Sequence, residues 1–147
     1  MPRPPAKVST PTFLPTMREL ARTYQAFSSY SDSHVRELGL TSPQFDVLAT
    51  LGGTDGMSMK ALAAATLVTK GTLTGIVDRL EKKGLLRREV PPENRRSFTI
   101  VLTDEGEALF KKVFPEHIAY LQKRFEQLTA DELKQLQSLL RKLREQF

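Results

Sequence analysis

Hydrophobic residues recur at helical spacing over most of the chain. From residue 13 to about residue 38 they step by three and four positions, which predicts an amphipathic helix with one buried stripe. Gly39 can close this helix in the left-handed conformation. The sequence Thr41-Ser-Pro-Gln44 has the form of a capping box with a proline in the first turn, so it predicts that a second helix begins here.

Two further helices follow, separated by a tight turn. The glycine-rich residues 52–56 end the second helix, and Ser58 is expected to cap a short third helix. Thr69 is expected to cap a fourth helix, which runs to about Lys83 and stops at Gly84. The buried face of this fourth helix consists of Leu73, Ile76, Val77 and Leu80.

Beyond Gly84 the hydrophobic period changes from about 3.6 to about 2, which predicts strands. Residues 85–102 are therefore expected to form two antiparallel strands. Their connection, residues 91–96, is an exposed basic tip, because its prolines cannot donate hydrogen bonds to a ladder. The inward positions are expected to be Leu86, Arg88, Val90, Phe98, Ile100 and Leu102.

Two helices complete the pattern. Thr103 is expected to cap a fifth helix, and Pro115 lies inside its pattern, where it should bend or restart the helix. The sequence Thr129-Ala-Asp-Glu132 is a second capping box, which predicts the start of a sixth helix. The sixth helix carries an apolar stripe at spacings of 3, 4, 3 and 4, made of Leu133, Leu136, Leu140, Leu143 and Phe147.

The stripe of the sixth helix needs a covering surface. It could fold back on the chain's own first and fifth helices, or it could pack against a second copy. Each buried leucine contributes about 1.5–3 kcal/mol in either arrangement. We favour a homodimer, with residues 13–40 and 104–147 as dimerisation helices, because a compact central unit leaves no single core that covers every stripe. Residues 1–12 are expected to be a flexible arm before one domain, residues 13–147.

Composition excludes several functional classes. The 147 residues are 39% hydrophobic and 27% charged, as in one ordinary domain. The absence of cysteine excludes disulfides, cysteine-rich zinc sites, iron–sulfur clusters and thiol chemistry. With only two histidines a multi-histidine metal cage is impossible, and we expect neither a metal nor a cofactor.

The location of the protein can also be predicted. No apolar run approaches the ~20 residues that a membrane span needs, so we expect no membrane partner. The first 15 residues hold five of the nine prolines and no apolar run, so a cleaved leader is not expected. These features predict a cytoplasmic protein.

Positive charge is concentrated in one segment. Residues 60–96 contain nine basic and four acidic side chains, so this segment carries the whole net charge of +5. Such a concentration indicates a polyanionic partner. Charge alone leaves open a solvated basic face without a partner.

The fourth helix is suited to enter a DNA groove. Gly71 and Gly75 lie opposite its apolar face and leave the outer surface without side chains. A glycine in an exposed helix interior lowers helix stability by about 1 kcal/mol relative to alanine, so a pair of them suggests a functional role. One such role is close approach of the helix backbone to a major groove roughly 12 Å wide, although the glycines could merely loosen a surface helix. The other candidate DNA contacts on this segment are Thr69, Lys70, Thr72, Thr74 and Arg79.

The hairpin strengthens this prediction. Arg95 and Arg96 can reach an adjacent minor groove or clamp phosphates, and Asn94 can shape the turn, although such arginines can also be merely solubilising. Asp78 does not suit a position against phosphate, so we expect it to pair with Lys82 or with an arginine of the hairpin. A groove-sized helix followed by a basic hairpin predicts binding to double-stranded DNA.

Several segments together resemble the MarR family of winged helix-turn-helix transcriptional regulators. They are LTSPQFDVL at 40–48, LTGIVDRLEKKGLL at 73–86, NRRS at 94–97 and LTDEG at 102–106, and the resemblance extends from about residue 14 to residue 147. It implies a mainly α fold with a small β-hairpin wing (α+β), in which residues 41–103 form the winged helix-turn-helix lobe and residues 85–102 the wing. It also implies an obligate homodimer on a pseudo-palindromic operator.

The resemblance also implies a ligand site, and at one position this sequence differs from the family pattern. Family members commonly bind a small phenolic or aromatic anion between the dimerisation and DNA-binding parts. For such a site we nominate Arg22 as the partner of a carboxylate and His117 as a hydrogen-bonding group, although both could be ordinary helix residues. The departure is Asn94, which stands where the family wing usually has aspartate, so the charge that would restrain the arginine two residues on, Arg96, is missing.

Three functions are compatible to different degrees with these sequence features. The first is a DNA-binding regulator, most simply a repressor that a ligand relieves. The second is a winged-helix protein-interaction module whose basic segment binds an acidic partner. The third is a small enzyme, which we do not expect because the sequence has no nucleophile elbow, phosphate-binding glycine loop, metal spacing or acid–base pair.

Overall fold

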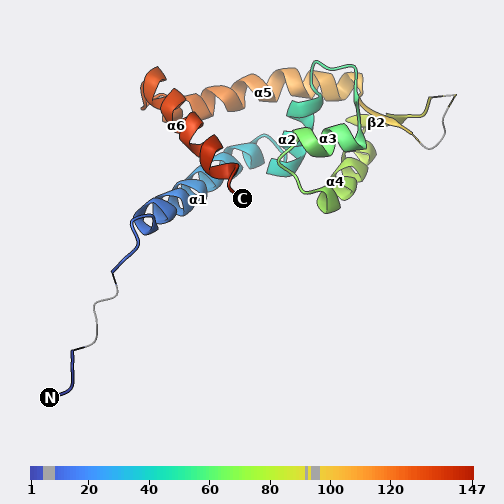
Figure 1. Cartoon of the computed structure of the whole chain (residues 1–147). Helices are drawn as coiled ribbons and strands as arrows, with labels where there is room; N and C mark the ends of the chain where they lie inside the picture. Colours follow the sequence, from blue (N-terminus) through green and yellow to red (C-terminus); the bar gives the residue numbers. More distant parts are fainter. Residues whose placement is uncertain (5–8, 92, 94–96) are drawn as a thin grey trace.

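Six helices and three short strands form the fold in the computed structural model, which describes residues 1–4, 9–91, 93 and 97–147. Figure 1 shows a lobe built from α2, α3, α4 and the sheet, with α1, α5 and α6 extending from it. The mainly α fold with a β-hairpin wing is therefore confirmed. The elements in chain order are α1 (Leu14–Glu37), α2 (Ser42–Leu51), β1 (Met57–Ser58), α3 (Met59–Ala65), α4 (Lys70–Lys82), β2 (Leu86–Glu89), β3 (Thr99–Leu102), α5 (Asp104–Phe125) and α6 (Ala130–Arg144).

Local capping fixes most helix boundaries where the sequence predicts them. The side chains of Thr41 and Thr129 close complete capping boxes, and that of Thr103 accepts a hydrogen bond from the backbone of residue 106. Thr69 occupies the N-cap position of α4 but makes no bond to the backbone, so that expected side-chain cap is wrong. Its hydroxyl instead lies 2.9 Å from the hydroxyl of Thr72.

The hairpin is one part of a three-stranded antiparallel sheet in the order β1-β3-β2. Leu86 pairs with Leu102, and on the other edge of β3 Met57 pairs with Ile100. The sequence did not predict β1, because two residues are too few to show an alternating pattern. Val90 was expected to face inward, but β2 ends one residue before it and its side chain is 53% exposed.

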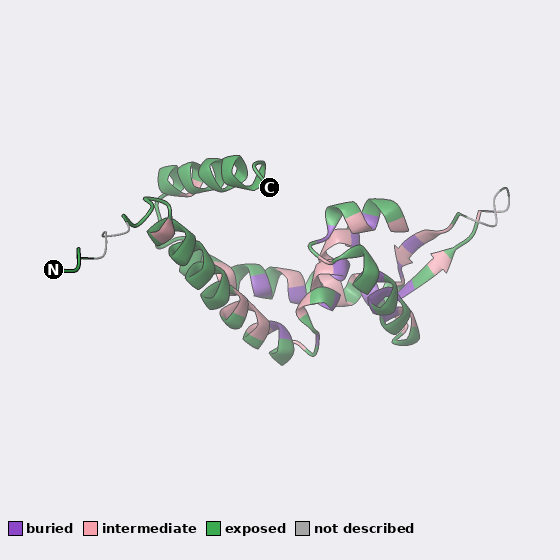
Figure 2. Ribbon diagram, turned by 60° about the horizontal axis from the view of Figure 1, so that its bottom comes forward, coloured by how far each residue is buried: buried purple, intermediate pink, exposed green. Residues whose placement is uncertain are grey.

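The buried core lies in the lobe rather than in the terminal helices. The four apolar residues expected on the inner face of α4 are all buried, together with residues of α2, α3 and the sheet. Figure 2 shows α6 and most of α1 coloured as exposed. In α6 no residue is buried. One core therefore fixes α4 and the wing relative to each other.

Two helices of the terminal region differ in how they meet this core. The helix α5 runs unbroken through Pro115, so the expected restart at this residue is wrong. It joins the core through Val113 and carries His117, also buried, toward α1 and α2. The helix α6 leaves its apolar stripe uncovered within one chain.

Candidate DNA-binding surface and ligand pocket

The outer surface of α4 is open, as the DNA-binding prediction requires. A methyl group added at Gly71 or Gly75 would meet nothing within 4 Å, so the backbone is accessible at both positions. The opposite face anchors the helix in the core. The residues expected to contact DNA on this segment are all exposed, namely Thr69, Lys70, Gly71, Thr72, Thr74, Gly75 and Arg79.

Both acidic residues of α4, Asp78 and Glu81, pair with an arginine of the wing. Asp78 accepts a hydrogen bond from Nη2 of Arg88 at 2.5 Å, which confirms the expected pairing with an arginine of the hairpin. Nη1 of the same guanidinium donates to Glu81 at 2.7 Å. These bonds, the one to Asp78 foremost, raise the pKa of Arg88. The network ties the wing to α4 and neutralises carboxylates that would otherwise oppose phosphate.

The tip of the wing was expected to supply further contacts. Asn94, Arg95 and Arg96 lie outside the described residues. Nearer the lobe, Arg87 of β2 is exposed and its guanidinium forms an ion pair with Glu89 at 2.7 Å. The described part of the wing therefore carries both a partly exposed arginine network that anchors it to α4 and an exposed ion pair.

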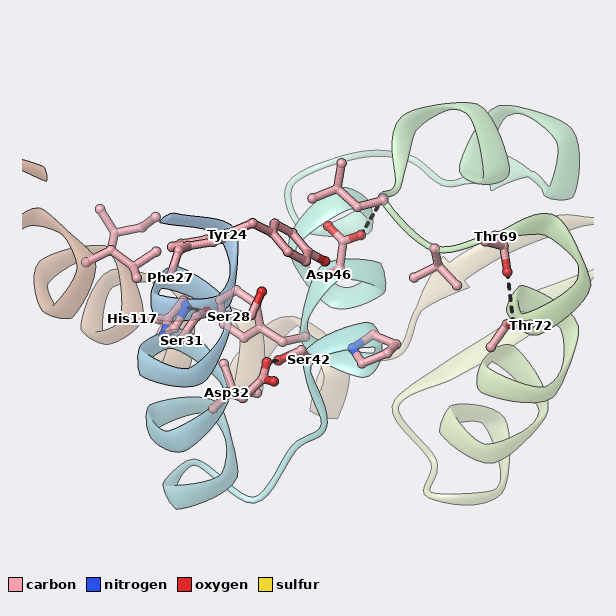
Figure 3. Close-up of a pocket in the computed structure, with 17 residues that line it drawn as sticks. Tyr24, Phe27, Ser28, Ser31, Asp32, Ser42, Asp46, Thr69, Thr72 and His117 are labelled. Atoms are coloured by element: carbon pink, nitrogen blue, oxygen red, sulfur yellow. Dashed lines mark hydrogen bonds between the residues drawn. The ribbon is translucent and has the colours of Figure 1, made fainter. Parts of the chain in front are cut away.

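A pocket of about 460 Å³ lies between the terminal helices and the DNA-binding lobe. Figure 3 shows its side chains coming from α1, α2, α5 and the turn before α4. Its walls combine aromatic and apolar groups with hydroxyls and two carboxylates. The lining residues that bear on its chemistry are Tyr24, Phe27, Ser31, Asp32, Ser42, Phe45, Asp46, Thr69, Thr72 and His117. A cavity with apolar walls and a few polar groups is the usual form of a small-molecule site.

One hydrogen bond in the pocket wall joins α2 to the turn that leads into α4. Oδ2 of Asp46, on α2, accepts the backbone N–H of Leu67 at 2.6 Å. Leu67 belongs to the turn that leads into α4, and its own side chain is 93% exposed. The pocket and the DNA-binding surface also share Thr69 and Thr72 (Figure 3). Sequence patterns did not reveal this link, because it joins residues far apart along the chain.

The second carboxylate of the pocket joins α1 to α2. Asp32 accepts a hydrogen bond from the hydroxyl of Ser42, the first residue of α2 (Figure 3). Neither Asp32 nor Asp46 forms an ion pair with a basic residue in the described part of the chain. The fixed charges that line the pocket are therefore negative.

His117 lies at the inner wall of the pocket and is only 3% exposed. Its Nδ1 is 2.9 Å from Nδ1 of His34, so one ring donates and the other accepts, and its Nε2 is 3.1 Å from the hydroxyl of Ser31. Burial, and then the charge of His34, lower the pKa of His117, so the ring is neutral at neutral pH. No pattern in the sequence indicates that these two histidines, 83 positions apart, lie in contact.

Aromatic rings extend this histidine pair into a stack between α1 and α5. The ring of His34 stacks on Tyr120 with centroids 4.1 Å apart, and Tyr120 stacks on Tyr30 at 4.0 Å. On the pocket side, Phe45 meets His117 edge to face at 4.6 Å. The stack packs the two long helices together beside the pocket and gives it a rigid wall.

Arg22 is placed differently from His117. It lies on the exposed side of α1, with its guanidinium 3.9 Å from the carboxylate of Glu19, and it does not line the pocket. Within one chain the structure thus does not bring together the two residues nominated for ligand binding.

The described residues contain neither a metal site nor a membrane-spanning helix. No group of three or more histidine, aspartate and glutamate side chains is arranged to hold a metal ion. In the same part of the chain, each helix is too short or too polar to cross a membrane.

The amino-acid sequence of the chain is similar to those of known transcriptional regulators. A sequence model described as MarR family matches residues 38–97. The HTH-type transcriptional regulator YkoM of Bacillus subtilis is 32% identical over 125 residues, which cover 85% of this chain and 81% of that protein.

Solved structures agree with this likeness. The MarR family transcriptional regulator Sco3205 from Streptomyces coelicolor, solved in complex with DNA, aligns with a TM-score of 0.84 and 25% identity over 97% of this chain and 92% of that one. BpsR from Bordetella bronchiseptica, whose DNA binding is regulated by 6-hydroxynicotinic acid, aligns with a TM-score of 0.81 and 27% identity over 92% and 97%.

Proposed function

Because the chain belongs to the MarR family of winged helix-turn-helix transcriptional regulators and binds DNA, we propose that it is a homodimeric repressor of a pseudo-palindromic operator, relieved by a small aromatic ligand. Members of this family are transcription regulators, not enzymes. The alternative function, a protein-interaction module that binds an acidic partner, is therefore replaced by DNA binding.

The main support for a homodimer is the apolar stripe of α6, which is left exposed within one chain. Leu136 and Leu140 are 40% and 43% exposed, Leu143 is 38% exposed, and Leu133 is only partly buried. Phe147 follows the same stripe and is almost fully exposed. Apolar surface of this extent is rare on a monomer, and α1 and α5 add Met17, Leu20 and Phe125 to it. A second copy of residues 13–40 and 104–147 supplies the matching surface.

The dimer sets the spacing of the two DNA-binding lobes, residues 41–103. Each α4 enters a major groove and each wing reaches the flanking minor groove, with half-sites about 10 bp apart from centre to centre. The open face of α4 supports this assignment, because its backbone can approach base edges closely. The proposed DNA contacts are Thr69, Lys70, Gly71, Thr72, Thr74, Gly75, Arg79, Asn94, Arg95 and Arg96.

Relief by a ligand is supported by the position of the pocket. It lies between the dimerisation helices and α4, and two proposed DNA contacts, Thr69 and Thr72, form part of its wall. A molecule in this pocket therefore acts on the surface that meets DNA. The regulation of BpsR by a small aromatic acid is in line with such a mechanism.

Sedimentation and DNA binding together test this proposal. At micromolar concentration the protein should sediment as a dimer and bind selected genomic fragments in preference to random DNA. The double variant Leu136→Glu and Leu140→Glu should sediment as a monomer and lose this preference, since charges then occupy the apolar seam. Ser138→Glu, on the exposed side of the same helix, is the control and should change neither property. A wild-type monomer would contradict the proposal.

A further inference from the structure

We propose that the pocket selects a cationic aromatic amine, that the Asp46 carboxylate is its counter-ion, and that binding loosens the turn that leads into α4. This inference rests on the proposed function for its effect on DNA, and it assigns the chemical class of the ligand from the pocket itself.

The charge of the pocket wall selects against an anion. Among the described residues that line it, the formally charged groups are the carboxylates of Asp32 and Asp46, and none is a lysine or an arginine. His117 is neutral there, because burial lowers its pKa. Arg22, the cation that an aromatic acid would need, lies outside the pocket. An anionic ligand would therefore meet like charge without a compensating partner, whereas an ammonium group would meet opposite charge.

The two carboxylates retain capacity for such a partner. An ionised carboxylate can accept about four hydrogen bonds. In the described residues, Asp46 accepts one from the backbone of Leu67, and Asp32 accepts one from Ser42. An ammonium group offers three donors and can bind the Asp46 carboxylate without first displacing a basic side chain.

The remaining wall suits the aromatic part of the ligand. Tyr24 and Phe27 of α1 face the pocket (Figure 3). Phe45 of α2 also lines it. Aromatic faces attract cations and bury planar rings. The volume of about 460 Å³ lies in the range of small-molecule sites. The cavity thus combines ring-binding surface with negative charge.

Asp46 links the binding of a ligand in the pocket to the binding of DNA by α4. Its bond to the N–H of Leu67 is the polar connection of α2 to the turn before α4, and the exposed side chain of Leu67 adds little packing there. An ammonium ion at the same carboxylate competes for its lone pairs and weakens this bond. Thr69 and Thr72 then move with the turn, and with them the start of α4.

Three indole probes that differ in charge test the ligand class. Tryptamine is cationic, tryptophol is its neutral analogue, and indole-3-acetate is anionic. Isothermal titration of the full chain should show at least tenfold tighter binding of tryptamine than of tryptophol, and weaker binding still of indole-3-acetate. Equal or tighter binding of indole-3-acetate would overturn the proposal, and so would the failure of all three to bind at millimolar concentration.

Substitution of Asp46 tests the counter-ion. Asp46→Asn keeps an oxygen that can accept the Leu67 N–H but removes the charge. It should therefore fold as the wild type does, while the preference for tryptamine over tryptophol falls to within about twofold. Asp55→Asn, which makes the same change of charge in an exposed turn outside the pocket, should retain the full preference. Unchanged selectivity in Asp46→Asn would refute the role of this residue.

The effect on DNA is read separately by fluorescence anisotropy. Saturating tryptamine should weaken DNA binding of the wild type by about tenfold or more and leave Asp46→Asn unaffected. Tryptamine binding without any change in DNA affinity would overturn the link through Leu67. Failure of the proposed function is distinguishable, because a ligand-free chain that is monomeric or does not bind DNA fails before any amine is added.

Discussion

Replacing Gly75 by alanine should raise the stability of the protein while lowering its affinity for DNA. The residue lies inside α4, and a Cβ atom at this position would meet nothing within 4 Å. Glycine in a helix interior is about 0.8–1.0 kcal/mol less favourable than alanine, so the variant should gain about 1 kcal/mol. For a chain of this size that gain raises the melting temperature by roughly 2–4 °C.

The opposite effect on DNA follows from the same methyl group. If the bare face of α4 lies against base edges, the methyl group enters an interface packed as densely as a protein interior. Overpacking of this kind typically costs about 1–3 kcal/mol, which corresponds to roughly five- to 150-fold weaker binding. Scanning calorimetry measures the first effect, and fluorescence anisotropy with a selected operator fragment measures the second.

A matched control separates the two effects. Ser33→Ala replaces an exposed helical residue on α1, away from α4, and should raise stability slightly without changing DNA affinity. Weaker DNA binding in Gly75→Ala together with a raised melting temperature excludes misfolding as the cause. A variant that is more stable and binds the operator as tightly as the wild type would refute the placement of this face in the groove.

Three further changes test other parts of the fold. Gly106→Ala should destabilise the protein by about 1–3 kcal/mol in urea unfolding, because its Cβ would lie 1.9 Å from the carbonyl oxygen of Leu85. Burial lowers the pKa of His117, so the unfolded chain binds more protons and stability should fall as the pH drops below about 6.5. His117→Gln should remove this component, which urea unfolding at pH 7.5 and 5.5 can measure. Arg88→Met should cost less than about 1 kcal/mol of stability, since its acidic partners are half exposed, but should weaken DNA binding measured by anisotropy by freeing their charge.

The sequence predicted features that depend on neighbouring residues. Capping boxes at Thr41 and Thr129, and the stop of α4 at Gly84, where φ is +76°, follow from hydrogen bonds or backbone conformations within a few positions. The buried face of α4 follows from helical periodicity. Such signals are local, so they can be interpreted before the fold is known.

The pocket could not be predicted in the same way. The pairing of His34 with His117 and the bond from Asp46 to Leu67 join residues 83 and 21 positions apart, and no periodic pattern marks either. The nomination of Arg22 rested on the family resemblance and not on a pattern in the sequence; within one chain the residue lies on the exposed side of α1, 3.9 Å from Glu19. The strand β1 could not be predicted either, because two residues are too few to show an alternating pattern.

The strength of one hydrogen bond is enough to couple the pocket to DNA. Allosteric coupling of tenfold corresponds to about 1.4 kcal/mol, and a hydrogen bond to a charged group contributes about 1.5–3 kcal/mol. The bond from Leu67 to Asp46 is of this kind but is exposed to solvent, so its contribution lies at the lower end of this range. The stack of His34 and Tyr120 holds α1 against α5 and so keeps the opposite wall of the pocket in place. A ligand that weakens the bond therefore changes the position of α4 relative to a fixed scaffold, and a loss of about tenfold in DNA affinity requires no larger rearrangement.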